Sequence, residues 1–157
     1  MKSELDKVNM LTRREIEARL AGPLIKGFIK ALGREEALRV VEQVMEDLGR
    51  QAGRDLAEQM GGNSIRCLAR GHGRYAAGDA YRMKILELTD KSYHVDITWC
   101  AYAEMYRSLG LADLGLLLSC GRDFAFTEGF NPKIKLTRDK TLLQGDEVCS
   151  YRFDLQE

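Results

Sequence analysis

Four cysteines are the residues of this sequence best suited to chemistry, and Cys100 has the most suggestive position. An alternating segment that ends at Trp99 predicts a strand, and the segment from Ala101 onward predicts a helix. Unpaired backbone N–H groups and the macrodipole at a helix N-terminus favour a thiolate over a thiol. We therefore expect a lowered pKa at Cys100 and consider this residue a candidate nucleophile.

The strand that leads to Cys100 also carries His94 and Asp96. A period of two places the three side chains on one face, which suggests a cysteine, histidine and aspartate site. Successive residues on one face are about 6.5 Å apart, so His94 would lie about 20 Å from Cys100. We therefore interpret His94 and Asp96 as part of a solvated sheet face.

Cys120 and Asp123 form a second candidate pair. Residues three apart lie on one face of a helix, and the surrounding segment is strongly apolar. A carboxylate in such a helix is costly to bury unless it is paired or functional, and a raised pKa would suit a general acid or base. The alternatives are that Asp123 faces solvent beside Arg122 or pairs with a buried arginine.

The remaining cysteines have weaker patterns. Cys149 shares the apolar face of a strand, so we interpret it as a core residue, and Cys67 has no supporting context. The sequence has no CxxC pair. A zinc site made by Cys100, Cys120 and Cys149 with Asp123 or a histidine is an alternative role for the thiols.

The N-terminal part predicts helices. Thr12 and Glu15 have the spacing of a capping box. Apolar residues follow at helical spacing up to Gly33, a candidate C-terminal cap. Because Pro23 falls inside this run, we expect a kink or break near Gly22.

A second helix follows, with an apolar side from Leu38 to Met60, and it ends at Gly61. We expect both helices to pack in the core or against a partner helix, so they offer a surface for a homo-oligomer. Residues 64–80 predict a helix fragment or a mobile loop. His72 lies there between two glycines, and we interpret it as an exposed loop residue.

The remainder predicts an antiparallel sheet. The expected strands are Tyr81–Leu88, Tyr93–Trp99, Lys133–Arg138 and Glu147–Leu155, and the expected inserted helices are Ala101–Leu109 and a helix from Asp113 to Glu128 closed by Gly129. The predicted class is α+β: N-terminal helices followed by an antiparallel sheet of about four strands with two inserted helices.

Composition narrows the function classes. With 157 residues, the chain suits a single domain, helical over 1–63 and mixed over 64–157. A net charge of zero and the lack of a basic stripe argue against nucleic-acid binding. No run approaches the roughly 18 apolar residues of a membrane span, and the N-terminus has no signal core. We therefore expect a cytoplasmic protein with reduced thiols.

Several motifs resemble one known family. They are Cys100-Ala-Tyr-Ala-Glu104, Leu109-Gly110, Cys120-Gly-Arg-Asp123, Phe130-Asn-Pro132, the 141–145 stretch with Asp146, and Cys149-Ser-Tyr-Arg-Phe153. They are similar to motifs of the L-2-amino-thiazoline-4-carboxylic acid hydrolase family. The first motif departs from the family, because Trp99 stands where we expect an arginine that would hold a substrate carboxylate.

The resemblance implies a cysteine-dependent hydrolase that opens a small cyclic amidine of the thiazoline type. It implies Cys100, Cys120 and Asp123 as catalytic residues and Tyr102, Asn131 and Cys149 as substrate-binding residues. No cofactor is expected beyond the zinc alternative. The closing stretch also resembles small-molecule-binding domains of the 4-vinyl reductase type, so the rival hypothesis is a sensor or carrier without turnover.

Overall fold

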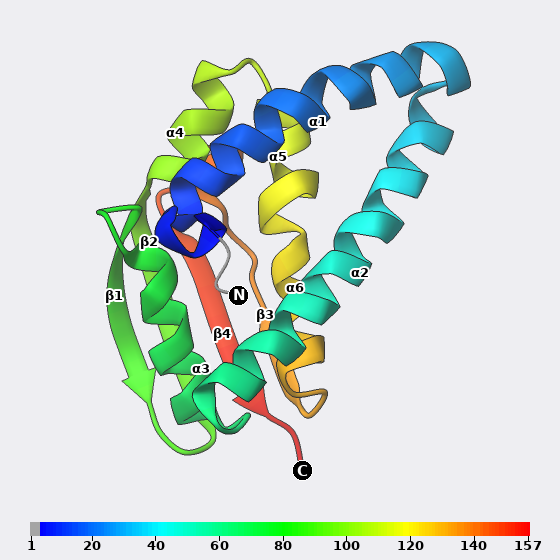
Figure 1. Cartoon of the computed structure of the whole chain (residues 1–157). Helices are drawn as coiled ribbons and strands as arrows, with labels where there is room; N and C mark the ends of the chain where they lie inside the picture. The colour runs from blue at the N-terminus through cyan, green and yellow to red at the C-terminus, as the bar shows by residue number, and fades with distance from the viewer. Residues whose placement is uncertain (1–3) are drawn as a thin grey trace.

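A computed structural model describes residues 4–157 and shows helices packed on one face of an antiparallel sheet (Figure 1). In chain order the elements are η1 (Glu4–Lys7), α1 (Met10–Leu32), α2 (Arg34–Met60), α3 (Ile65–His72), η2 (Gly73–Ala76), β1 (Tyr81–Leu88), β2 (Ser92–Cys100), α4 (Ala101–Ser108), α5 (Ala112–Gly115), the π-helical turn η3 (Leu116–Cys120), α6 (Arg122–Phe130), β3 (Ile134–Thr137), η4 (Leu142–Gln144) and β4 (Cys149–Leu155). The predicted α+β class is confirmed.

Helix α1 begins earlier than its sequence pattern indicated. Asn9 is the N-cap, and its Oδ1 accepts a hydrogen bond from the Thr12 backbone N–H at 2.9 Å, so Thr12 is inside the helix and the predicted capping box is wrong. The helix passes through Pro23 without a break. Gly33 ends it with a positive φ of 85°, as predicted.

Helices α1 and α2 form a long hairpin. From the turn at Gly33, α2 runs back and diverges from α1, and the segment from α5 to α6 fills the space between them (Figure 1). Helix α2 ends as predicted at Gly61, which adopts the left-handed conformation. The tip of the hairpin projects beyond the body of the molecule (Figure 1).

Helix α6 crosses α2 very closely. A Cβ at Gly53 would lie 2.1 Å from the carbonyl oxygen of Phe126, and a Cβ at Gly129 would lie 2.1 Å from that of Arg50. The predicted end at Gly129 is therefore wrong, because this glycine is needed for helix packing and the helix continues to Phe130. The predicted start at Asp113 is also wrong, since Leu111 is the N-cap of α5.

The sheet has the order β1-β2-β4-β3, with every neighbouring pair antiparallel. Both predicted hairpins are confirmed, and β2 pairs with β4 to join them. Arg82 pairs with Trp99 while Met83 pairs with Ile97, so Thr98 is an extra residue in β2. This β-bulge reverses the facing of the residues after it.

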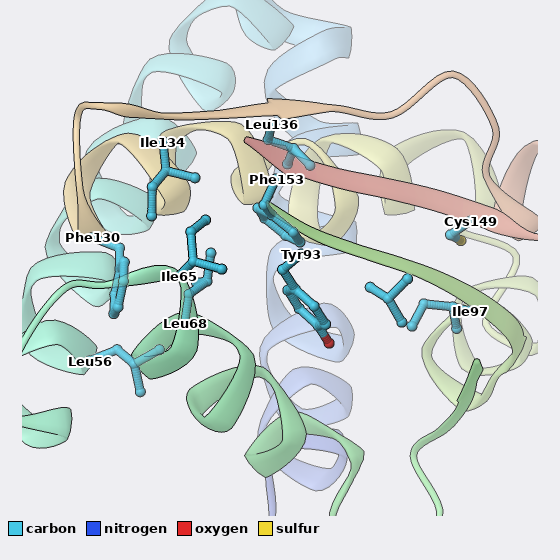
Figure 2. Close-up of a cluster of buried hydrophobic side chains, with 11 residues drawn as sticks. Leu56, Ile65, Leu68, Tyr93, Ile97, Phe130, Ile134, Leu136, Cys149 and Phe153 are labelled. Atoms are coloured by element: carbon cyan, nitrogen blue, oxygen red, sulfur yellow. The ribbon is translucent and has the colours of Figure 1, made fainter. Parts of the chain in front are cut away.

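The covered face of the sheet carries the main core. Tyr93, Val95 and Ile97 of β2 and Phe153 of β4 are buried, and the rings of Tyr93 and Phe153 stack at 5.6 Å. Figure 2 shows these side chains against residues from the helices, which are Leu56, Ile65, Leu68 and Phe130. The core fixes α2, α3 and α6 over the sheet, and the candidate site lies beside it.

Candidate active site

A cavity of about 140 Å³ lies between the helices and the covered face of the sheet. Its lining brings together segments that are far apart in the sequence. The lining residues are Met10, Arg14, Gly49, Ala52, Leu68, His72, Tyr75, Tyr81, Ile97, Cys100, Tyr102, Ser119, Cys120, Arg122, Asp123, Phe126, Thr127, Cys149, Tyr151 and Phe153. All three predicted catalytic residues are among them.

Asp123 is held by one of its two carboxylate oxygens. Oδ2 accepts hydrogen bonds from Arg138 Nη1 at 2.7 Å and from the Tyr151 hydroxyl at 2.6 Å. Oδ1 has no hydrogen-bond partner within residues 4–157, and it is not sealed from solvent. Because Asp123 lines the cavity and 35% of its side chain is accessible, Oδ1 is the oxygen that remains for a ligand or a water molecule.

Two opposing influences set the pKa of Asp123. Burial raises it, and the Arg138 charge together with the Tyr151 hydrogen bond lowers it, with a net rise. Arg138, only 6% exposed, is therefore the buried arginine that was one of the alternatives for this carboxylate. A carboxylate that is oriented on one oxygen and has a raised pKa is suited to proton transfer.

The thiols around the cavity do not have the predicted electrostatics. Cys100 is the N-cap of α4, but burial raises its pKa more than the N–H groups of Ala103 and Tyr102 lower it. The expected lowered pKa is therefore wrong. Burial and the neighbouring Asp123 raise the pKa of Cys120 to about 12. Cys149 is a core residue as predicted, and its Sγ accepts a hydrogen bond from the Leu142 N–H.

The bulge at Thr98 separates Cys100 from His94 and Asp96. Cys100 lines the cavity with Ile97, whereas Trp99 is on the outer side, where Arg82 covers its ring. The predicted common face for Cys100, His94 and Asp96 is therefore wrong, because the alternation breaks before Cys100.

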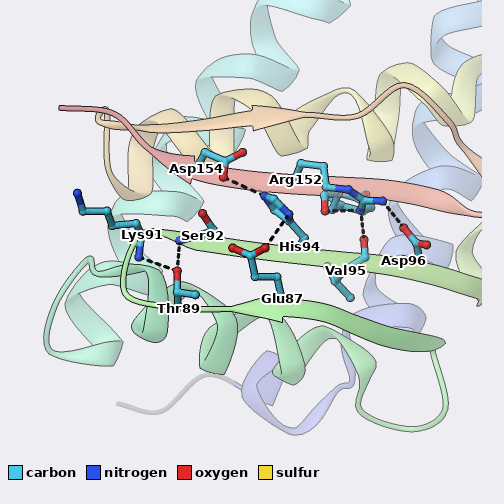
Figure 3. Close-up of polar contacts among 10 residues, drawn as sticks. Glu87, Thr89, Lys91, Ser92, His94, Val95, Asp96, Arg152 and Asp154 are labelled. Carbon is cyan, nitrogen blue, oxygen red and sulfur yellow. Dashed lines mark hydrogen bonds and ion pairs between the residues drawn. The ribbon is translucent and has the colours of Figure 1, made fainter.

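The uncovered face of the sheet carries His94 and Asp96 in ion pairs across strands (Figure 3). His94 Nε2 lies 2.9 Å from Asp154 Oδ1, and Arg152 Nη2 donates to Asp96 Oδ1 at 2.8 Å. The interpretation of these two residues as a polar sheet face, away from the site, is confirmed.

His72 is a site residue that the sequence pattern missed. It ends α3, lines the cavity and makes ring contacts with Tyr81, Tyr93, Tyr151 and Phe153. Nδ1 and the Tyr93 hydroxyl form a hydrogen bond of 3.1 Å. Burial lowers the His72 pKa to about 4, so the imidazole is neutral at neutral pH. The prediction of an exposed loop histidine was wrong.

Arg14 and Arg122 were also missed as lining residues. They come from α1 and α6 and are 14% and 12% exposed. Both contact the same oxygen, Oε2 of Glu17. Arg122 stands inside the Cys120-Gly-Arg-Asp123 motif, which was its only signal, whereas Arg14 has none in a single sequence because isolated arginines are abundant in this chain.

Two of the three predicted substrate-binding residues line the cavity. Tyr102 and Cys149 line the cavity, and the Tyr102 hydroxyl donates to the Tyr75 carbonyl at 3.2 Å. Asn131 does not line it: its side chain donates to the Asn63 carbonyl and accepts from the Lys133 N–H, which fixes the turn after α6. Within residues 4–157, no three His, Cys, Asp or Glu side chains are grouped closely enough to hold a metal ion.

The comparisons with known proteins identify the family. A family model described as L-2-amino-thiazoline-4-carboxylic acid hydrolase matches residues 13–153, which is most of the chain. The chain belongs to this family. The match runs from helix α1 to strand β4 and therefore includes most of the residues that line the cavity. No curated protein matches the sequence at a significant level.

Two solved structures share the fold at low sequence identity. The phenol-responsive sensory domain of the transcription activator PoxR with phenol is 15% identical, with a TM-score of 0.53 over 86% of this chain and 72% of that one. A trafficking protein particle complex subunit 3 from Naegleria fowleri, covalently bound to palmitic acid, is 12% identical, with a TM-score of 0.51 over 93% of this chain and 96% of that one. In the described part of the chain, no helix has the length and apolar character of a membrane span.

Proposed function

We propose that the protein hydrolyses a small cyclic amidine of the thiazoline type, with Asp123 as the proton-transferring residue. The observation that carries this proposal is the free Oδ1 of Asp123 inside a small cavity, with Oδ2 held by Arg138 and Tyr151. The family assignment supplies the substrate class. Asp123 then combines fixed orientation, a raised pKa and access to a bound ring.

The chemical step is the addition of water to the amidine carbon. Asp123 Oδ1 accepts a proton from the attacking water as the oxygen bonds to the carbon that carries the ring sulfur. The carbon–nitrogen double bond of the ring becomes a single bond, and its nitrogen takes that proton from Asp123. The carbon–sulfur bond then breaks as the new hydroxyl becomes a carbonyl, and the hydroxyl proton passes through Asp123 to the departing sulfur. The products are a carbamoyl group and a free thiol on one molecule, so water is the only co-reactant.

Cys100 and Cys120 fit the lining of this site better than the role of attacking group. Their raised pKa values keep both thiols protonated at neutral pH, and the thiolate is the nucleophilic form. Within residues 4–157 neither Sγ has a histidine or lysine partner that would take its proton. We therefore favour direct attack by water over a covalent cysteine intermediate, which remains the alternative mechanism.

The test is turnover of L-2-amino-thiazoline-4-carboxylate by the purified, reduced protein. Loss of the ring and release of a free thiol are followed together, with and without added Zn²⁺, because a zinc site is the remaining cofactor hypothesis. Thiol release that is lost in Asp123→Asn supports the proposal. If intact protein releases no thiol under either condition, the hydrolase function is wrong.

A ligand-binding module without turnover is the second candidate function. The cavity is rich in aromatic side chains, and His72 lies among Tyr81, Tyr93, Tyr151 and Phe153. The two similar solved structures described above each contain a bound small molecule, phenol in one and palmitic acid in the other. Native mass spectrometry that finds a retained apolar compound, together with no hydrolysis, would favour this function.

We further propose that two copies assemble through the α1–α2 hairpin. A groove of about 320 Å³ with an apolar lining runs between the two helices, and large solvent-exposed apolar side chains border it. The exposed members along the hairpin are Ile16, Leu20, Leu24, Phe28, Leu32, Val40, Val44 and Leu48. Monomeric proteins rarely leave so extended an apolar surface uncovered.

The charges beside this groove favour a second copy as the occupant. From Leu20 to Leu32 the only charges on α1 are Lys26 and Lys30. From Arg34 to Leu48, α2 has five carboxylates and two arginines, which gives a net charge of −3. In a two-fold symmetric pair, the basic half of α1 can face the acidic half of α2 of the other copy, and this contact is made twice.

A further inference from the structure

Arg14 and Arg122 lie together at one end of the cavity with little to neutralise them. Arg14 is in the first turns of α1 and Arg122 is the first residue of α6, and each is less than one-seventh exposed. Nη1 of Arg14 pairs with Glu17 Oε2, and Nη1 of Arg122 lies 3.9 Å from the same oxygen. The half-exposed carboxylate of Glu17 is therefore shared by the two arginines.

The arginine of α6 is poorly satisfied. Among the residues that the structure describes, Arg122 makes no hydrogen bond, and its ion-pair partner is Glu17, at 3.9 Å. Burial and the charge of Arg14 lower its pKa. The Tyr75 hydroxyl lines the same region and also has no hydrogen-bond partner in the described chain. Donors gathered in a partly buried site with one shared acceptor suit an anionic ligand.

Asp123, the carboxylate in the cavity lining, does not neutralise Arg14 and Arg122. Asp123 is adjacent to Arg122 in the sequence, but its Oδ2 is occupied by Arg138 and Tyr151, which lie on β3's C-terminal extension and on β4. The cavity lining thus contains two cations and one anion, and the anion has its own arginine. An incoming ligand can supply the missing negative charge.

We propose that Arg14, Arg122 and Tyr75 form a subsite for the substrate carboxylate, which competes with Glu17 for the two guanidinium groups. This inference rests on the proposed function and names the part of the site that selects an acid. Position 99 does not contribute to this subsite, because Trp99 is on the outer side of the sheet, away from the cavity. An apolar cavity of about 150 Å³ holds one six-membered ring, so a single small ring with a carboxylate suits this cavity.

The subsite also orients the ring. Arg122 and Asp123 are successive residues of α6 and line the same cavity, so the helical backbone fixes their spacing. A ring held by its carboxylate at Arg14 and Arg122 presents its remaining atoms to the rest of the lining, including Asp123 Oδ1. Arg14 and Arg122 are therefore binding and positioning residues.

The test compares two probes that differ only in the carboxylate. L-2-Amino-thiazoline-4-carboxylate and 2-amino-2-thiazoline are titrated calorimetrically into the full chain and into Arg14→Met and Arg122→Met. Arg19→Met is the matched control, since Arg19 is an exposed arginine of α1 that pairs with Glu15 outside the cavity. Thermal melting of each variant verifies folding, and Arg122→Lys retains the charge if Arg122→Met does not fold.

We expect the unaltered chain to bind the carboxylate probe at least roughly tenfold more tightly than the decarboxylated ring. This preference should fall to about one in Arg14→Met or Arg122→Met and persist in Arg19→Met. Equal binding of both probes, or a preference that survives in both variants, overturns the subsite and leaves the hydrolase proposal standing. Preferential binding without turnover keeps the subsite and overturns the hydrolase. Binding of neither probe overturns both.

Glu17 provides an independent measurement. If the ligand carboxylate displaces Glu17, then Glu17→Gln removes the competitor and should tighten binding of the carboxylate probe by a few-fold while leaving the decarboxylated ring unchanged. A weaker affinity for the carboxylate probe in Glu17→Gln would show that Glu17 organises the arginines and does not compete for them, and would overturn this part of the proposal.

Discussion

The cavity and the hairpin groove both include residues of α1 and α2, yet their surfaces differ in chemistry. The N-terminal turns of α1 and the C-terminal half of α2 line the cavity, which contains two arginines, an aspartate, a histidine and three thiols. The C-terminal half of α1 and the N-terminal half of α2 line the groove with apolar residues. One helical hairpin therefore contributes to two chemically different surfaces, one toward each end.

The chemical difference between the cavity and the groove determines what kind of partner each can recognise. Apolar side chains gain free energy by the exclusion of water, which has no directional preference and suits a broad protein partner. The cavity instead offers individual unpaired atoms, such as Asp123 Oδ1, that fix the orientation of a small molecule. Changes in the cavity should therefore alter turnover but not assembly, and changes in the groove should do the reverse.

The largest expected effect comes from Asp123→Asn. The amide can still accept from Arg138 and Tyr151 but cannot take a proton, so turnover should fall by roughly 10²–10⁴-fold. A steady-state assay of thiol release measures this, and sedimentation should show unchanged assembly. Asp113→Asn is the matched control, because Asp113 is half-exposed and outside the cavity. A loss of less than about fivefold would remove Asp123 from the mechanism.

The next largest effect concerns the groove. Phe28→Glu places a carboxylate in the proposed interface twice, once per copy, so the dissociation constant of the dimer should rise at least about 100-fold. Analytical ultracentrifugation over a range of concentrations measures it. Leu86→Glu, on the exposed part of β1, is the control for adding a charge to an exposed apolar site. An unaltered chain that sediments as a monomer throughout would contradict the assembly proposal.

The pH profile sharpens the assignment of the base. A general base works when deprotonated, so kcat/KM should fall as the pH drops through the raised pKa of Asp123. The Tyr151 hydrogen bond lowers this pKa, so Tyr151→Phe should move the acidic limb to higher pH and slow the reaction below that limb by up to roughly tenfold. His72→Gln should leave the limb in place, since His72 is not among the groups that shift the pKa of Asp123. If the acidic limb moved to lower pH in Tyr151→Phe, a group other than Asp123 would be responsible for this limb.

The smallest expected effects belong to the thiols. Cys100→Ala and Cys120→Ala remove lining atoms but not the proposed base, so turnover should change by less than about tenfold in either variant. Cys67→Ala, outside the cavity, shows the effect of removing a thiol elsewhere. The covalent mechanism would instead be supported by a loss of 10³-fold or more in one variant, with activity in the parent chain that rises steeply at alkaline pH.

Local patterns predicted most elements because their causes are local. The alternation in β2, the turn before it and the glycine ends of α1 and α2 depend on residues close in sequence. The spacing of Cys120 and Asp123 predicted a shared face for the same reason, and both line the cavity. The errors at Asn9 and Gly129 arose because several neighbouring residues could have ended each helix. A side-chain cap decided the first boundary, and a close helix crossing decided the second.

The electrostatics of the site could not be read from local position. A helix N-terminus lowers a thiol pKa, but burial by distant segments acts on Cys100 more strongly. His72 shows the same lesson, because its glycine neighbours suggested exposure while four rings from β1, β2 and β4 enclose it. A single extra residue in β2, Thr98, turned Cys100 away from His94 and Asp96.

The sequence by itself determined the α+β class, the order of helices and hairpins, and the family, because hydrophobic periodicity and short motifs are written along the chain. Only the tertiary structure decided which polar groups share the cavity. Arg138 meets Asp123 across 15 positions, and Arg14 meets Arg122 across more than a hundred. The free energy of a charge depends on the neighbours and the water around it, and both are set by the packing of distant segments.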